Sequence, residues 1–164
     1  MIKFFKTSLS IFIFLFISRF IPHPPNFTNL IALSFYVPMI LGTRYIPIVV
    51  FSFIITDIFI GFHNTAFFTW SAVILICYLS KIFKETFFKR MGGVLICLTL
   101  FFVFTNLGFW MTGYYGYTFE GLQKSFIMAI PFFGNTLIST ILYSFIIECA
   151  ILVVKKIKYS TNKI

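Results

Sequence analysis

The segment Lys81–Arg90, KIFKETFFKR, separates two long apolar runs and carries four basic residues. If the apolar runs cross a membrane, the side on which segment 81–90 lies depends on whether residues 30–61 form one membrane-spanning helix or two. Each crossing takes the chain to the opposite side. Basic residues concentrate in the cytoplasmic loops of membrane proteins. With two helices there, this segment lies in the cytoplasm. Eleven of the thirteen Lys and Arg residues, including the four of the segment, are then cytoplasmic. One helix would place the segment outside, so the charge pattern predicts six crossings.

The composition indicates that these runs do cross a membrane. Hydrophobic residues make up 60% of the 164 residues and charged residues 10%, against about 25% charged in soluble domains. A chain of this length cannot bury so much apolar surface in its own core. The net charge of +9 does not indicate nucleic-acid binding, because the basic residues cluster beside the apolar runs.

The sequence therefore predicts an all-α, polytopic membrane protein that forms one integral membrane domain over residues 1–164. Both ends of the chain are predicted to be cytoplasmic. A helix needs roughly 20 residues to cross the hydrocarbon core, and the second span is the shortest, with Pro38 inside it. The six predicted spans are residues 5–20, 30–42, 46–61, 66–82, 91–111 and 132–154.

Three charged residues within the apolar spans, Arg19, Asp57 and Glu148, stand apart from the basic clusters. Asp57 and Arg19 lie at similar depths near the outer ends of their helices, and we predict that they pair, since a charge inside a membrane is costly unless it is paired. The pair either only locks two helices together or also serves a site. Glu148 lies in the inner half of the last span, where it is expected to pair with Lys155 or Arg44 or to mark a proton path.

The loops predicted on the outer side are unusually polar. They contain RFIPHPPNFT (19–28), TDIFIGFHNT (56–65), TNLGFWMTGYYGYTFEGLQ (105–123) and PFFGNT (131–136). This one-sided enrichment predicts an outward-facing ligand site. Its candidate ligand-binding residues are His23, Asn26, His63, Asn106, Trp110 and Asn135.

Each candidate has alternatives. The two histidines either form hydrogen bonds within their loops, contact a ligand, or bind a metal with Asp57, although no fixed ligand spacing supports a metal. The asparagines either bridge helices or meet the polar edge of a ligand. Residues 118–130 are expected to form a short surface helix capped by Thr118. Catalytic and nucleotide-binding motifs are missing, so neither an enzyme nor a cofactor is predicted.

The polar motifs resemble those of a family of uncharacterised bacterial membrane proteins, a domain of unknown function. They run Arg-x-x-Pro-His-Pro-x-Asn-Phe-Thr, Asp-x-x-x-Gly-x-His, Thr-Asn-x-x-x-Trp, Glu-Gly-Leu and Pro-Phe-x-x-Asn-Thr. In this chain they begin at Arg19, Asp57, Thr105, Glu120 and Pro131. The match covers most of the chain in the same order and spacing.

That family in turn resembles, in topology, the substrate-binding S-components of energy-coupling-factor vitamin transporters. The resemblance implies six helices with cytoplasmic ends, and a vitamin bound under the loops that join helices 1–2, 3–4 and 5–6. It also implies the bacterial cytoplasmic membrane as the location and energising transporter subunits as possible partners.

Two functions remain open at this stage. The first is binding of a small molecule, resembling a vitamin or cofactor precursor, under the outer loops, with a role in uptake. The three prolines at positions 22, 24 and 25 would then stiffen one wall of the pocket. The second is a non-transporting structural or accessory role, in which the polar residues satisfy one another and leave no cavity.

Overall fold

The computed structural model describes residues 2–161, which form helices joined by short loops. No β-strand occurs within this range, so the predicted all-α fold class is confirmed. The helices are numbered along the chain, and two short 3-10 segments are named η1 and η2. Their bounds are α1 Ile2–Phe20, α2 Leu30–Leu41, η1 Thr43–Tyr45, α3 Ile46–Ile60, α4 Ala66–Leu79, η2 Ser80–Phe83, α5 Phe87–Met111 and α6 Phe119–Thr161.

Four helical segments are long and apolar enough to cross a membrane. They are Thr43–Ile60, Ala66–Phe83, α5 and α6. The helix α2 has 12 residues, so at 1.5 Å per residue it is about 18 Å long, against about 30 Å for the hydrocarbon core. It is therefore too short to cross a bilayer alone. The helix α1 has 19 residues, but two lysines near its start and Arg19 near its end limit its apolar stretch.

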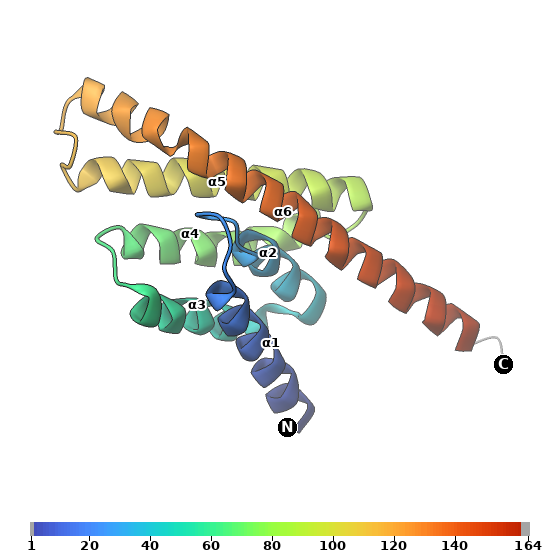
Figure 1. The fold of residues 1–164 in the computed structure, drawn as a ribbon. Coiled ribbons are helices and arrows are strands. Elements are labelled where there is room, and N and C mark those ends of the chain that lie inside the picture. Colours follow the sequence, from blue (N-terminus) through green and yellow to red (C-terminus); the bar gives the residue numbers. More distant parts are fainter. Residues whose placement is uncertain (1, 162–164) are drawn as a thin grey trace.

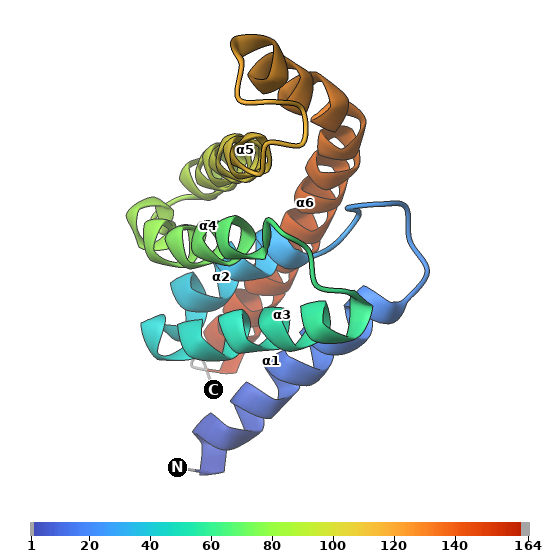
Figure 2. The ribbon, with the colours of Figure 1, turned by 90° about the vertical axis from the view of Figure 1, so that its left-hand side faces the viewer.

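The loops define the two ends of the bundle (Figure 1). Loops 61–65 and 112–118 lie at one end, which we call the loop end. The segment 81–90 lies at the opposite end, which we call the basic end. The helix α1 crosses α3 obliquely, and α6 runs across α2 and α5 (Figures 1 and 2). The orientation of these two ends in a membrane stays a prediction.

The helix α2 lies at the centre of the bundle and contacts α3, α4, α5 and α6. Most of its residues are buried, as expected for a helix that is apolar on every side. It contributes to both clusters of core side chains, one with α1, α3 and α4 and the other with α4 and α5. The short helix is therefore covered by protein along most of its surface.

The helices α4 and α5 approach closely at Gly108. A methyl group at that position would lie 2.2 Å from Cγ of Phe68, well inside the distance at which two carbon atoms can approach each other. The absence of a side chain at Gly108 thus sets the separation of α4 and α5 near the loop end.

Three helices begin earlier than the sequence predicts, and the first of them, α1, begins at Ile2 rather than at residue 5. The helix α5 begins at Phe87 rather than 91, because the Thr86 hydroxyl caps it by accepting a hydrogen bond from the Lys89 amide at 3.2 Å. The last span was predicted from residue 132, but its helix begins at Phe119. The predicted surface helix 118–130 is therefore not a separate element.

The helix α6 is one continuous 43-residue helix with Pro131 inside it. Thr118 does act as its predicted cap, since its hydroxyl oxygen accepts a hydrogen bond from the Gly121 amide at 3.1 Å. At 1.5 Å per residue the helix is about 65 Å long, and it extends well past the other helices at the basic end (Figure 1).

Candidate functional site

The loop 21–29 between α1 and α2 lies beside the middle of the bundle rather than at the loop end (Figure 1). Asn26 adopts φ +62°, a left-handed conformation that Asn tolerates better than most residues. Asn135 of α6 donates a hydrogen bond from Nδ2 to the carbonyl oxygen of Pro25 at 3.0 Å. This bond ties the loop to a helix that lies 110 residues further along the chain.

Two adjoining cavities lie under this loop. The larger has a volume of about 330 Å³ and the smaller about 170 Å³. They share four lining residues, Asn26, Phe101, Thr105 and Thr136. The larger cavity extends between α1, α2, α3 and α4, and the smaller between α5 and α6. We call the pair the outer cavities.

The walls of the outer cavities combine polar and aromatic side chains. In addition to the four shared residues, the larger cavity is lined by Arg19, Thr28, Leu30, Ile31, Phe53, His63, Thr65 and Thr69. The smaller is lined by Leu98, Phe102, Asn106, Ala129, Phe132 and Phe133. This mixture of apolar walls with a few convergent polar groups is typical of small-molecule sites.

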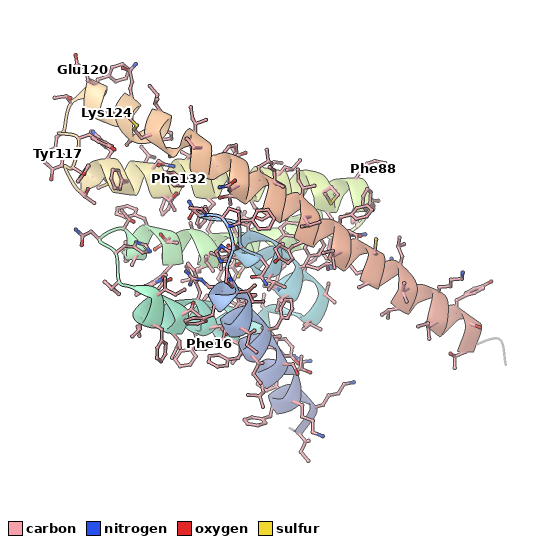
Figure 3. All side chains as sticks on the ribbon, in the orientation of Figure 1. Phe16, Phe88, Tyr117, Glu120, Lys124 and Phe132 are labelled. Carbon is pink, nitrogen blue, oxygen red and sulfur yellow. The ribbon has the colours of Figure 1, made fainter. Side chains whose placement is uncertain are left out.

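A third cavity of about 180 Å³ continues towards the loop end. It shares Asn106 and Phe132 with the smaller outer cavity and also contacts Tyr115. The Lys124 ammonium lies 5.0 Å from the centre of the Tyr115 ring, within cation–π distance. Glu120, Lys124 and Tyr117 stand at the loop end, whereas Phe88 stands at the basic end (Figure 3).

Arg19 and Asp57 meet as the sequence predicts. Arg19 Nη1 lies 2.7 Å from Asp57 Oδ1, and the carboxylate is only 2% exposed. The indole nitrogen of Trp70 donates to the second oxygen, Oδ2, at 2.8 Å. The Arg19 guanidinium also donates to the Thr56 hydroxyl and lies 4.5 Å from the centre of the Phe53 ring. Both carboxylate oxygens are thus satisfied by α1 and α4.

The structure separates the six predicted ligand-binding residues into two groups. Asn26, His63 and Asn106 line the outer cavities. His23 is exposed, with Nδ1 2.9 Å from the carbonyl oxygen of Pro24. Asn135 holds the loop, as described above. Trp110 donates from Nε1 to the carbonyl oxygen of Thr118 at 3.2 Å and so braces the tip of the α5–α6 hairpin.

The polar groups of the three lining candidates are partly free to meet a ligand. Asn106 donates from Nδ2 to the carbonyl oxygen of Phe102 at 2.7 Å, which leaves its side-chain oxygen for the cavity. His63 Nδ1 is 2.9 Å from the Thr65 hydroxyl, so its Nε2 is the nitrogen left to the cavity. No group of three or more His, Cys, Asp or Glu residues able to hold a metal occurs among residues 2–161.

Sequence reasoning missed the threonines of the site. Thr105 and Thr136 line both outer cavities, from facing helices. Each of their hydroxyls donates to a carbonyl oxygen one turn earlier in its own helix, so each oxygen retains a lone pair for the cavity. Each threonine adjoins a predicted site asparagine, Asn106 or Asn135, within a polar motif, and this adjacency is the signal that could have identified them.

A second buried ion pair lies near the basic end, and the partners predicted for Glu148 from the sequence were wrong. Glu148 pairs with Arg90 rather than with Lys155 or Arg44. Arg90 donates from Nε to Oε1 and from Nη2 to Oε2, the latter at 2.6 Å. The Tyr36 hydroxyl donates to Oε1 at 2.9 Å. All three side chains are buried, and they join α2, α5 and α6.

Comparison with known proteins places the chain in a family. No curated protein and no solved structure gave a match. A family model does match, over residues 2–162, and it is described as a family of unknown function, DUF6580. The matched residues are almost the entire chain, which confirms the predicted membership of an uncharacterised family. The chain belongs to DUF6580.

Proposed function

We propose that the protein binds a small molecule in the outer cavities and takes part in its uptake across the bacterial cytoplasmic membrane. The observation that carries this proposal is the pair of adjoining cavities, which Asn26 and Thr28 of loop 21–29 help to line. A purely structural bundle would bury its polar residues against one another, whereas here several line open space. The resemblance to vitamin-binding S-components supports the same function and implies a ligand resembling a vitamin or cofactor precursor.

The cavity walls favour an uncharged, ring-shaped ligand with polar edges. Arg19 is the charged residue that lines the outer cavities, and Asp57 neutralises it. Phe101, Phe102 and Phe133 offer ring faces, on which a flat ring stacks in an offset or edge-to-face arrangement. The asparagine, threonine and histidine groups supply hydrogen bonds at its rim. The volumes match one or two small rings, near the lower end for ligand sites.

The proposal requires the loop end to face outwards. We expect thiol-reactive labelling of single cysteines in intact cells to modify residues 112–118, and to leave residues 84–88 unmodified until the membrane is permeabilised. The reason is the concentration of basic residues at the basic end. Labelling of residues 84–88 from outside would reverse the orientation and place the cavities on the cytoplasmic side.

Native mass spectrometry of protein purified from its own membrane is the direct test of ligand binding. We expect a bound molecule of a few hundred daltons, and its identity then allows affinity to be measured. Purified protein that carries no molecule, and that shows no melting shift with any candidate vitamin, would favour the structural alternative.

Asn106→Ala should weaken binding of the ligand so identified by roughly three- to tenfold, because it removes one or two hydrogen bonds worth about 0.5–1.5 kcal/mol each. His23→Ala is the control: His23 is another predicted ligand-binding residue, in loop 21–29, but it does not line the outer cavities. The control should bind normally, and both variants should melt within a few degrees of the parent. Equal effects of the two changes would exclude this site.

A further inference from the structure

A line of polar residues winds along α6 and leads away from the outer cavities. Thr136, Thr140, Ser144 and Glu148 are spaced four residues apart, so each lies one turn beyond the one before it and is rotated from it by about 40° around the helix. Thr136 lines both outer cavities. Thr140, Ser144 and Glu148 are all buried. The line therefore begins at the cavity wall and ends at the buried carboxylate.

Three buried hydroxyls on this line and its neighbour α2 lack hydrogen-bond partners. Thr140 Oγ1 and Ser34 Oγ have no hydrogen-bond partner within the described chain, and Ser144 Oγ has none of acceptable geometry, although the Tyr36 phenol lies close to it. The adjacent Ser139, which is equally buried, donates to the carbonyl oxygen of Thr136 at 3.0 Å. Buried polar groups are normally satisfied by protein or by ordered water, so we expect ordered water at these hydroxyls.

Glu148 meets titratable or charged groups from each helix packed around it. From α5, Arg90 donates to both carboxylate oxygens. From α2, Tyr36 donates to Oε1, and from α6 itself, the Lys155 charge acts on the same carboxylate. The Ser144 hydroxyl lies close to the Tyr36 phenol. The last hydroxyl of the line therefore adjoins the group that holds Glu148.

We propose that Ser34, Thr140 and Ser144 hold ordered water that carries protons from the outer cavities to Glu148, and that this carboxylate takes up the proton that drives uptake. An ionisable residue inside a membrane bundle is a functional candidate by default, and here a polar route leads to it. The coupling to uptake rests on the proposed function. The proton route itself does not.

The proton transfer balances without another reactant. A hydronium ion in the water file gives its proton to a carboxylate oxygen of Glu148, which forms one O–H bond, breaks another and leaves water. Arg90 keeps its charge and loses its counter-ion. Its Nη1 still donates to the carbonyl oxygens of Lys84 and Glu85 at the basic end. The proton returns to water on that side, and the ion pair re-forms.

Silver-ion accessibility tests the water file without any ligand. Single Thr140→Cys, Ser144→Cys and Ser139→Cys variants would be made in a Cys149→Ala background, reconstituted in lipid vesicles and exposed to silver nitrate. The blocked fraction would be read by mass spectrometry after denaturation and alkylation. We expect residues 140 and 144 to react at least about tenfold faster than 139, because a packed site reacts only after local opening. Equal rates at the three positions would overturn the water file.

Infrared spectroscopy tests the carboxylate. At acidic pH we expect a protonated-carboxyl band that is missing in Glu148→Gln, shifted in Glu148→Asp and retained in the exposed control Glu85→Gln. In heavy water this band shifts as deuterium replaces the carboxyl proton. We expect that exchange to be about tenfold slower in the double variant Thr140→Val with Ser144→Ala, because exchange at a site closed to water requires local opening. Ser139→Ala should exchange as the parent does. A band that is unaffected by Glu148→Asp, or exchange that the double variant leaves unchanged, would overturn the proton route.

The two proposals fail separately. If both tests support the proton route but the protein binds no molecule, the proposed function is wrong. Proton access to Glu148 would still hold. If the protein binds its ligand in the outer cavities but Glu148 is closed to water and exchanges slowly, only the proton route is wrong.

Discussion

Arg90→Gln is expected to destabilise the protein by about 3–5 kcal/mol, the usual loss when one partner of a buried ion pair is removed. Glu148 would keep only the Tyr36 hydrogen bond, in a position that is 2% exposed. The helices α2, α5 and α6 would lose their common polar contact near the basic end. The measurement is the midpoint of thermal unfolding in detergent, followed by circular dichroism or by thiol reactivity of buried Cys97.

The neighbouring residue offers a matched control. Lys89 also pairs with a glutamate, Glu85, but both side chains of that pair are more than half exposed, and such pairs contribute about 0–1 kcal/mol. Lys89→Gln should therefore melt close to the parent. The double variant Arg90→Gln with Glu148→Gln should recover part of the loss, since no unpaired charge remains. Equal melting of Arg90→Gln and Lys89→Gln would show that the buried pair does not hold the bundle.

Asp57→Asn is the second change with a large expected effect. It leaves the Arg19 guanidinium without a counter-charge between α1 and α3. Arg19 lines the larger outer cavity and is 15% exposed, so water would relieve part of the cost. We expect a loss of about 2–3 kcal/mol, somewhat below that of a fully buried pair. The double variant Arg19→Gln with Asp57→Asn should melt above the single variant, and strictly additive losses would contradict the pairing.

Trp70 gives this prediction an optical readout. Its indole nitrogen donates to Asp57 Oδ2, and the chain has only one other tryptophan, Trp110. In a Trp110→Phe background, Asp57→Ala should change the emission of Trp70, because the indole loses its acceptor. Unchanged emission together with unchanged melting would show that the Asp57 carboxylate does not accept this hydrogen bond from Trp70.

The sequence predicted the helices better than their ends. The apolar runs located all six helices, because in a membrane protein hydrophobicity alone separates helix from loop. The ends depended on local capping that composition does not show. The Thr86 cap moved the start of α5 outwards. Pro131, which falls between the predicted surface helix and the predicted last span, lies inside α6 because a proline removes only one helical hydrogen bond.

The same error concealed the Arg90–Glu148 pair. Arg90 was grouped with the loop lysines of Lys81–Arg90 because of its place in a basic run. Once Thr86 is taken as the cap, Arg90 falls inside the helix, where a lone glutamate on another helix needs a partner. Arg19 and Asp57, by contrast, stood alone in apolar runs at matching depths, so their pairing followed from the sequence. Cavity volume depends on packing and had no sequence signal.

The position of Pro131 also indicates how deep α6 would lie in a bilayer. It has no amide hydrogen, so the carbonyl oxygen one turn earlier, at residue 127, lacks its helical partner. An unsatisfied carbonyl inside hydrocarbon costs several kcal/mol, so we expect this turn to lie at the level of the lipid headgroups if α6 crosses the bilayer. The hydrocarbon would then end roughly 20 residues further along α6, just before Lys155 and Lys156, whose charges would fall among the opposite headgroups.

On this placement we expect the proline-rich loop 21–29 to lie below the membrane surface. Asn135 follows Pro131 by four residues, which is about 6 Å of helix, and it holds the carbonyl oxygen of Pro25. Non-helical backbone at that depth is tolerated only against protein or water, never against lipid. We therefore expect the outer cavities beside the loop to be wet, and a ligand that enters them to displace water that lies beneath the headgroups of the surrounding lipids.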